Sequence, residues 1–338
     1  WLGGKLSDKI GFYKIMIFSL MTSGIAFFGL QFVTSFEGLL VAMFFIMVVA
    51  DMFRPAMFVS LGAYAKPENR TRALTLVRLA INLGFAAGPA LGGLLIMTVG
   101  YKGLFWVDGA TCILAILIFW IKVKEKKKSK YTDKEHPGEI LTNSVFKDRP
   151  FWIFLGATLI TGILFFQLFT TIPLYHKEQF NLSELQTGLL LTLNGVLIFF
   201  LEMPIVSYIE RHKINKLKII TLGCLAMAIS LYLLLVNQWA GILIIMMLFM
   251  TFGEMFVFPF SNSFAMSRAP KGHEGRYMAI FTMSYSTAHI LSAEAGMDMI
   301  RLFSYQNNWF FMGTLGIIGV LLFIWTKKLV KYEPPRNI

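Results

Sequence analysis

The stretch Arg78-Leu-Ala-Ile-Asn82-Leu-Gly84-Phe-Ala-Ala-Gly88-Pro89-Ala-Leu-Gly92-Gly93 places one charged residue and a series of glycines inside a long apolar segment. Gly84, Gly88 and Gly92 recur at every fourth position, so a helix carries all three on one face. Small residues at this spacing let the backbone of a second membrane helix approach closely. The pattern therefore predicts a membrane helix with a surface along which another helix packs or slides.

The composition indicates a multi-pass membrane protein. Apolar residues make up 56% of the 338 positions, charged residues only 15%, and Phe alone contributes 33. About ten segments are long and apolar enough to cross a hydrocarbon core of ~30 Å at a rise of ~1.5 Å per residue. The expected spans are residues 15–34, 38–60, 73–98, 103–122, 151–174, 186–208, 217–236, 239–263, 276–299 and 308–326.

The basic residues indicate the orientation, because Lys and Arg accumulate on the cytoplasmic side of bacterial membranes. If the segment before residue 15 is cytoplasmic, the basic residues outside the cytoplasmic segments are only Arg54, Arg78, Lys102, Lys177 and Arg301. We therefore expect a bacterial inner-membrane protein with a cytoplasmic central linker and C-terminus. This topology explains the net charge of +12 without a nucleic-acid partner.

The chain offers little for catalysis or for a cofactor. Its two cysteines, Cys112 and Cys224, both lie in apolar segments, so neither a disulfide framework nor a cysteine zinc site is expected. It contains no phosphate-binding loop, nucleophile elbow or His-Cys metal cluster. We therefore expect a protein that is not an enzyme and that holds no cofactor or metal.

An internal repeat predicts two related halves. Similar residues recur about 203 positions apart at four helix boundaries, which favours a duplicated six-helix unit. The pairs are Asp8-Lys9 with Glu210-Arg211, Pro55 with Pro259, Pro67 with Pro270, and Arg72 with Arg276. We expect an incomplete N-terminal bundle in residues 1–121, a linker in residues 122–149 and a C-terminal bundle in residues 150–338. The first helix and most of the second are expected to precede Trp1, and the basic linker either binds anionic lipid headgroups or is a solvated tether.

Several motifs resemble those of one transporter family. The pattern Gly-x-x-x-Gly-Pro-x-x-Gly-Gly from Gly84 to Gly93 resembles the fifth-helix signature of antiporters in the major facilitator superfamily. The segments 53–56, 67–73, 253–255 and 275–278 are similar to the bacterial multidrug-exporter branch, and no sugar-porter signature follows Trp120. The resemblance implies an all-α membrane protein of two pseudo-symmetric six-helix bundles. It also implies alternating access and close helix packing at Arg78, Asn82, Gly84, Gly88, Pro89, Gly92 and Gly93.

The segment from Gly4 to Lys14 resembles the cytoplasmic loop signature of the same family, although Phe12 and Tyr13 replace the expected basic residue. Glycine at position 11 permits a tight reversal of the chain. The resemblance implies that this loop latches the cytoplasmic gate. The gating residues expected from the loop and its repeat are Gly4, Asp8, Lys9, Gly11, Glu210 and Arg211.

Charged residues inside a membrane are costly unless paired or hydrated, so each is a candidate for function. The resemblance implies that the first, fourth, seventh and tenth helices line a cavity, which would bring Asp51, Arg54, Gln167 and Glu254 to it. Asp51 and Arg54 lie three residues apart and are expected to form an ion pair, either a permanent one or one that participates in coupling. Glu254 has no cation nearby in its own helix, which favours its protonated form. We predict that it couples protons to transport, although a hydrogen bond that only shapes the cavity is the alternative.

Three further positions have two open interpretations each. Arg78 either extends to the membrane surface or pairs with Glu202. His289 either relays protons or packs as a hydrogen-bonded side chain. Glu294 lies one turn from Asp298, so repulsion favours protonation of one of the two carboxyl groups.

The expected function is proton-coupled export of drug-like or lipophilic small molecules, with the lipid bilayer, substrate and protons as partners and a monomer as the functional unit. One alternative is a proton-coupled carrier of a metabolite such as a peptide, an amino acid or a siderophore. The other is a membrane receptor on the same scaffold that transports nothing.

Overall fold

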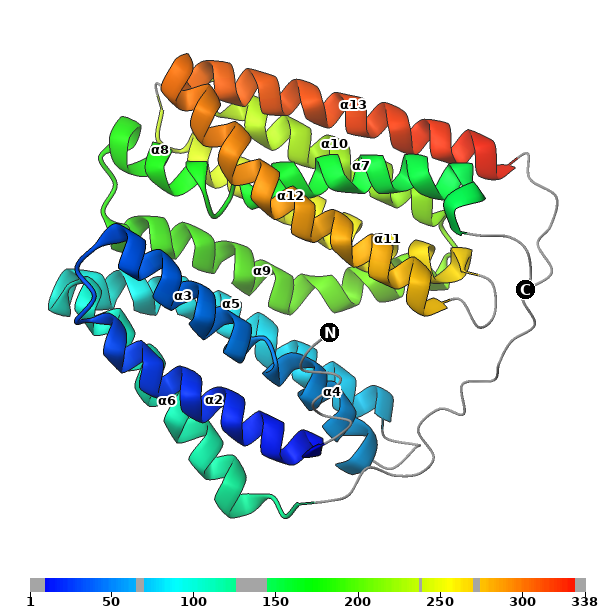
Figure 1. Ribbon diagram of the computed structural model, residues 1–338. Coiled ribbons are helices and arrows are strands. Elements are labelled where there is room, and N and C mark those ends of the chain that lie inside the picture. Colours follow the sequence, from blue (N-terminus) through cyan, green and yellow to red (C-terminus); the bar gives the residue numbers. More distant parts are fainter. Residues whose placement is uncertain (1–9, 65–69, 126–144, 237–238, 270–273, 332–338) are drawn as a thin grey trace. The chain divides into compact units, whose positions relative to one another are not determined.

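The computed structural model describes residues 10–64, 70–125, 145–236, 239–269 and 274–331, and every regular element within them is a helix (Figure 1). Seven helices in this described part are long and apolar enough to cross a membrane. The all-α membrane architecture is therefore confirmed. The chain divides into two compact units, one formed by residues 1–81 with 91–134 and the other by residues 82–90 with 135–338.

Unit 1 is organised around its first described helix, α2 (Phe12–Leu30), which packs against three others. The further helices are α3 (Phe36–Ala50), α4 (Phe53–Tyr64), α5 (Arg70–Val99, of which residues 82–90 belong to unit 2) and α6 (Tyr101–Lys122), and α2 packs against α3, α4 and α6. A Cβ atom on Gly24 would lie 3.0 Å from the carbonyl oxygen of Gly109, so only small residues allow α2 and α6 to approach this closely. The Tyr13 hydroxyl donates to the Val123 carbonyl at 2.9 Å and fixes the far end of the same pair.

The expected span 38–60 is interrupted, which corrects the prediction of one continuous helix. α3 ends at Ala50 and α4 begins at Phe53, so Asp51 lies at a helix end and not in the middle of a helix. Pro55 has no N–H group and cannot donate to the carbonyl of Asp51, four residues earlier. Close to this break, the Ser19 hydroxyl on α2 donates to the carbonyl of Val49 at 2.7 Å. This hydrogen bond helps to satisfy the carbonyl groups at the end of α3.

Unit 2 contains a short 3-10 helix, η2 (Val145–Lys147), followed by longer helices. These are α7 (Arg149–Phe166), α8 (Thr171–Phe180), α9 (Glu184–Arg211), α10 (Lys216–Leu233), α11 (Ile242–Arg268), α12 (Glu274–Leu302) and α13 (Tyr305–Lys331). The expected span 151–174 is also interrupted, between α7 and α8. Pro173 cannot donate to the carbonyl of Phe169, so the same chemistry explains this second break.

Small residues hold the helices of unit 2 together. α10 packs against both α11 and α13, and α7 packs against α12 and α13 (Figure 1). A Cβ atom at Gly223 on α10 would lie 2.8 Å from the carbonyl oxygen of Gly253 on α11, and the reverse distance is also 2.8 Å. Large apolar side chains, including the fully buried Phe154 and Trp309, fill the space between the helices. The closest seams are therefore at glycines other than those in the repeated pattern of α5.

The glycines that repeat along α5 do not meet another helix closely in this conformation. A Cβ atom at Gly84 or Gly88 would meet no heavy atom within 4 Å, and one at Gly92 would lie 3.9 Å from Leu104 Cδ2. The close approach expected from the sequence is therefore not observed at these three glycines, but it is observed at the neighbouring Pro89, whose carbonyl oxygen would clash with a Cβ atom at Gly188 on α9. A role of these glycines in another conformation stays a prediction.

We expect Gly88→Leu to stop transport with little change in the thermal unfolding temperature, because this conformation has room for the side chain. Gly253→Leu is the matched comparison, since its Cβ would lie 2.6 Å from Met227 Cγ and overpacking costs about 1–3 kcal/mol of folding free energy. Unfolding in detergent and substrate efflux from cells would be measured for both variants. Wild-type efflux by a well-inserted Gly88→Leu protein would remove this helix face from the mechanism.

Candidate functional site

A polar cluster joins α9 and α11 inside the apolar interior of unit 2. The Asn194 side-chain amide on α9 donates to Thr251 Oγ1 and to Glu254 Oε2 on α11, each at 3.0 Å. Thr251 in turn donates to the carbonyl of Met247 at 2.7 Å, and Asn194 is buried. The cluster therefore holds the Glu254 carboxyl group through one neutral donor, the Asn194 amide, which the Thr251 hydroxyl also engages.

The local sequence explains why these side chains meet. The Gly253 face of α11 packs against α10, which turns the neighbouring Thr251 and Glu254 towards α9. α9 begins with a capping box in which Ser183 and Gln186 satisfy each other's backbone N–H groups. Pro259 lies inside α11 and cannot donate to the carbonyl of Met255, so the helical hydrogen bonding is interrupted next to the carboxyl group.

A second carboxyl group lies in the same region. Glu202 is buried on α9, eight residues after Asn194 and therefore near the same helix face. Carboxyl groups inside membrane helices are rare and are candidates for a role in ion or proton movement. Glu254 and Glu202 are therefore the two candidate titratable groups on α11 and α9.

The structure places the other expected cavity residues differently. Asp51 and Arg54 are both exposed, and no ion pair joins them in this conformation. Gln167 is fully buried at the end of α7, where its amide nitrogen donates to the Ser292 carbonyl and hydroxyl oxygens, both at 2.9 Å. The Thr171 hydroxyl donates to the Gln167 amide oxygen. Gln167 therefore joins α7 to α12, and its polar atoms are already engaged.

The side chains of His289, Glu294 and Asp298 on α12 are exposed. His289 lies with its ring centroid 4.6 Å from that of Phe166. Glu294 is exposed, and Asp298 pairs with Arg301 at 2.9 Å. Asp298 therefore has a cationic partner of its own, which the sequence analysis did not include. The proton-relay hypothesis for His289 and Glu294 stays a prediction.

The gating residues are only partly described. Gly11 immediately precedes α2 with a backbone φ of +99°, a conformation that L side chains rarely adopt, so the requirement for glycine at this turn is evident. Glu210 and Arg211 end α9 with exposed side chains. Gly4, Asp8 and Lys9, and the side chains of Arg78 and Asn82, lie outside the described residues. The pairing of Arg78 with Glu202 therefore stays a prediction.

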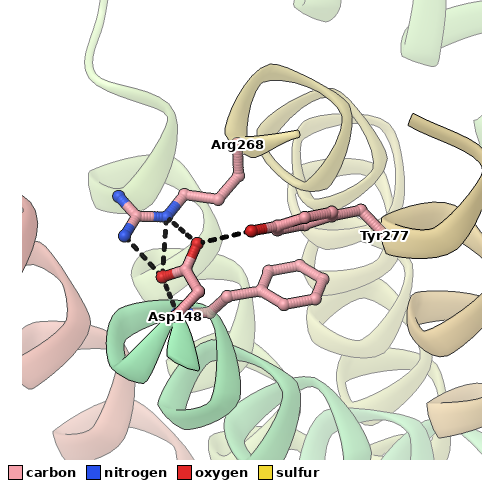
Figure 2. Close-up of polar contacts among 4 residues, drawn as sticks. Asp148, Arg268 and Tyr277 are labelled. Atoms are coloured by element: carbon pink, nitrogen blue, oxygen red, sulfur yellow. Dashed lines mark hydrogen bonds and ion pairs between the residues drawn. The ribbon is translucent and has the colours of Figure 1, made fainter. Parts of the chain in front are cut away.

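Sequence reasoning missed a buried ion pair at the end of unit 2. Figure 2 shows Arg268 and Tyr277 approaching the Asp148 carboxylate from different sides. Arg268 Nη2 lies 2.6 Å from Asp148 Oδ1, Arg268 Nε donates to Oδ2 at 3.0 Å, and the Tyr277 hydroxyl also donates to Oδ2 at 3.0 Å. All three residues are buried. The cluster joins the start of α7 to the end of α11 and the start of α12.

Of the residues in this cluster, Asp148 could have been recognised in the sequence as a residue that begins a helix. Asp148 is followed two residues later by Pro150, a combination that marks a helix start, and its carboxylate accepts from the backbone N–H of Phe151 at 3.2 Å. The linker expected from the sequence, residues 122–149, includes Asp148 and therefore misses this helix start. Arg268 lies 120 residues away in the chain, so no local pattern could identify it as the partner.

We expect Asn194→Ala to lower proton-driven transport about ten-fold, because a hydrogen bond to a charged group contributes roughly 1.5–3 kcal/mol. Thr251→Val is the matched control, because it removes the Thr251 hydroxyl that accepts from Asn194 but leaves the hydrogen bond from Asn194 to Glu254. Initial transport rates at equal protein levels in membrane vesicles would be compared. Equal rates for Asn194→Ala and wild type would show that Asn194 does not position the carboxyl group.

The geometry so far defines a multi-pass helical membrane protein with a protonatable group held between two helices, as expected of a transporter. Residues 2–293 match the family model of the Major Facilitator Superfamily, so the chain belongs to this family of transporters and is not an enzyme. The "Na(+), Li(+), K(+)/H(+) antiporter" of Planococcus maritimus is 22% identical, over 99% of this chain and 86% of that protein.

Two further similarities are informative. The "Quinolone resistance protein NorA" of Staphylococcus aureus is 25% identical over 57% of this chain and 50% of its own length. A crystal structure of a POT family transporter in complex with 5-aminolevulinic acid has a TM-score of 0.77 and 16% identity, over 96% of this chain and 84% of that one. This structural likeness shows the shared fold alone. The match to the family model confirms the family that the sequence motifs resemble, and the protein is therefore a multi-pass membrane protein.

Proposed function

We propose that this protein exports drug-like or lipophilic small molecules in exchange for protons, by alternating access of its two halves. The observation that carries the proposal is the Glu254 carboxyl group, held by Asn194 inside the apolar helices of unit 2. A group of this kind can bind a proton in one state of the cycle and release it in another. The similarity to a quinolone resistance protein supports a drug-like substrate.

The proposal also includes the membrane and the assembly. We place the protein in a bacterial inner membrane, with the central linker and the C-terminus on the cytoplasmic side, because the basic residues concentrate there. The functional unit is a monomer, with the small-molecule substrate and protons as its partners. Neither a metal nor a cofactor is part of the cycle.

One observation favours a second candidate function. The relative from Planococcus maritimus that exchanges Na⁺, Li⁺ or K⁺ for protons matches 99% of this chain, a larger part than the quinolone resistance protein matches. Exchange of a monovalent cation for a proton also requires a protonatable carboxyl group. Glu254 is therefore compatible with both activities, and the exchanged substrate has to be determined by experiment.

Everted membrane vesicles with an imposed acidic interior distinguish the two candidates. The dissipation of the pH gradient is followed with a fluorescent pH probe while a quinolone, a lipophilic dye or an alkali-metal salt is added. We expect the quinolone or the dye to collapse the gradient, and vesicles without the protein to show no response. A response to alkali cations alone would establish the second candidate, and no response to any addition would contradict proton-coupled exchange.

A further inference from the structure

A surface cavity of about 640 Å³ lies where α7 begins and α13 ends, both within unit 2. Its lining combines basic, aromatic and aliphatic side chains. They are Lys147, Asp148, Arg149, Pro150, Trp152, Ile153, Trp325 and Leu329. Because α7 starts one apolar membrane-crossing segment and α13 ends another, the cavity lies at the level of a membrane surface.

The charge of the cavity is positive. Lys147 and Arg149 are exposed, and no carboxylate among the described residues pairs with either side chain. Asp148 lies between them in the chain, but its carboxylate is buried against Arg268 and Tyr277. The negative charge of Asp148 is therefore neutralised inside the protein, while both positive charges face the cavity.

The other walls of the cavity are aromatic and aliphatic, which suits the glycerol region and the upper acyl chains of a lipid. The side chains of Trp152 and Trp325 are 42% and 52% exposed, although both lie in apolar membrane-crossing segments. Phe146 stacks on Trp152 with a distance of 6.0 Å between ring centroids. Tryptophan rings prefer the headgroup level of a bilayer, where one edge is polar and the other apolar. Ile153 and Leu329 continue the apolar wall beside them.

We propose that this cavity binds one anionic phospholipid of the surrounding bilayer. Lys147 and Arg149 hold its phosphate, and the glycerol region and upper acyl chains lie against Trp152 and Trp325. The cavity volume falls within the range of about 300–1,000 Å³ that is usual for small-molecule sites. Zwitterionic lipids bind less well, because their cationic headgroups meet two positive charges and, among the described lining residues, no free carboxylate.

The lipid would stabilise the pairing of α7 with α13 directly beside the buried ion pair of Asp148 and Arg268. Its phosphate compensates the two exposed positive charges, and its chains cover tryptophan surface that faces the membrane. This role does not depend on which substrate the protein transports. A negative result for lipid binding would therefore leave the proposed function unaffected, and a negative result for transport would leave the lipid site unaffected.

Native mass spectrometry of the purified full chain, titrated with phosphatidylglycerol or phosphatidylcholine, tests the proposal. A basic residue at an anionic lipid surface contributes a factor of roughly five to affinity. We therefore expect Lys147→Glu/Arg149→Glu to weaken phosphatidylglycerol binding by at least about 25-fold. The neutral pair Lys147→Gln/Arg149→Gln gives the same direction if charge reversal prevents folding.

Lys327 and Lys331 provide the matched control, because both belong to α13 at the same end of unit 2 but do not line the cavity. Lys327→Glu/Lys331→Glu is expected to leave tight binding of one phosphatidylglycerol intact. An equal loss in the control pair would indicate diffuse attraction and overturn the site. Equal affinity for phosphatidylcholine would overturn it as well. Displacement of the lipid by millimolar inorganic phosphate would identify a free-phosphate site instead.

Discussion

Glu254→Gln is expected to abolish uphill export driven by a pH gradient and to leave downhill exchange of substrate intact. Gln keeps the length of the side chain and still accepts the hydrogen bond from Asn194, but it cannot release a proton. Initial rates in everted vesicles, with and without an imposed pH gradient, separate the two activities. We expect uphill export to fall to the level of vesicles that lack the protein.

Two variants serve as controls for this result. Glu254→Asp keeps a titratable group on a shorter side chain and should retain part of the uphill export. Asn262→Ala changes an exposed polar residue two turns along the same helix and should transport like the wild type. Loss of both uphill export and downhill exchange in Glu254→Gln would instead indicate that Glu254 shapes the cavity or supports folding.

Arg268→Met is expected to lower the free energy of unfolding by about 3–5 kcal/mol, because it leaves the buried Asp148 carboxylate without its cation. The double variant Asp148→Asn/Arg268→Met removes both charges and should recover a large part of this loss. Denaturation in detergent of the wild type, Arg268→Met, Asp148→Asn and the double variant gives the four free energies of unfolding that a double-mutant cycle needs. Additive effects of the two single changes would show that the ion pair has no energetic coupling.

The exposed ion pair of α12 offers a matched comparison within the same unit. Arg301 and Asp298 are 75% and 52% exposed, so Arg301→Met should cost less than about 1 kcal/mol. Tyr277→Phe removes one of the donors to Asp148 and should cost about 1–2 kcal/mol. A loss for Arg301→Met as large as that for Arg268→Met would contradict burial as the source of the difference.

Much of the helical architecture could be predicted from the sequence. Each expected span coincides with one or two helices, because long apolar segments have to satisfy their backbone hydrogen bonds internally in a membrane. The two interruptions were missed, although Pro55 and Pro173 mark both of them. Proline inside a membrane helix is often tolerated, as Pro204 and Pro259 show here, so its presence alone does not locate a break.

The candidate site was predictable only in part. Glu254 could be singled out because a carboxyl group in an apolar helix is costly and no cation lies nearby in that helix. Its partner Asn194 could not be recognised, since an amide sixty residues away gives no local signal. The same limit applies to Gln167, whose hydrogen bonds to Ser292 depend on how α7 and α12 pack. Residue type indicates what a side chain can do, whereas tertiary packing decides which partner it meets.

Proton release on substrate binding is the most direct test of coupling through Glu254. The purified protein in weakly buffered detergent solution is mixed with a transported quinolone or dye, and a pH indicator records the protons released. The account predicts release from the wild type and none from Glu254→Gln, with substrate binding retained in both. Unchanged release from Glu254→Gln would contradict the account and assign coupling to another carboxyl group, with Asp51 and Glu294 the next to test.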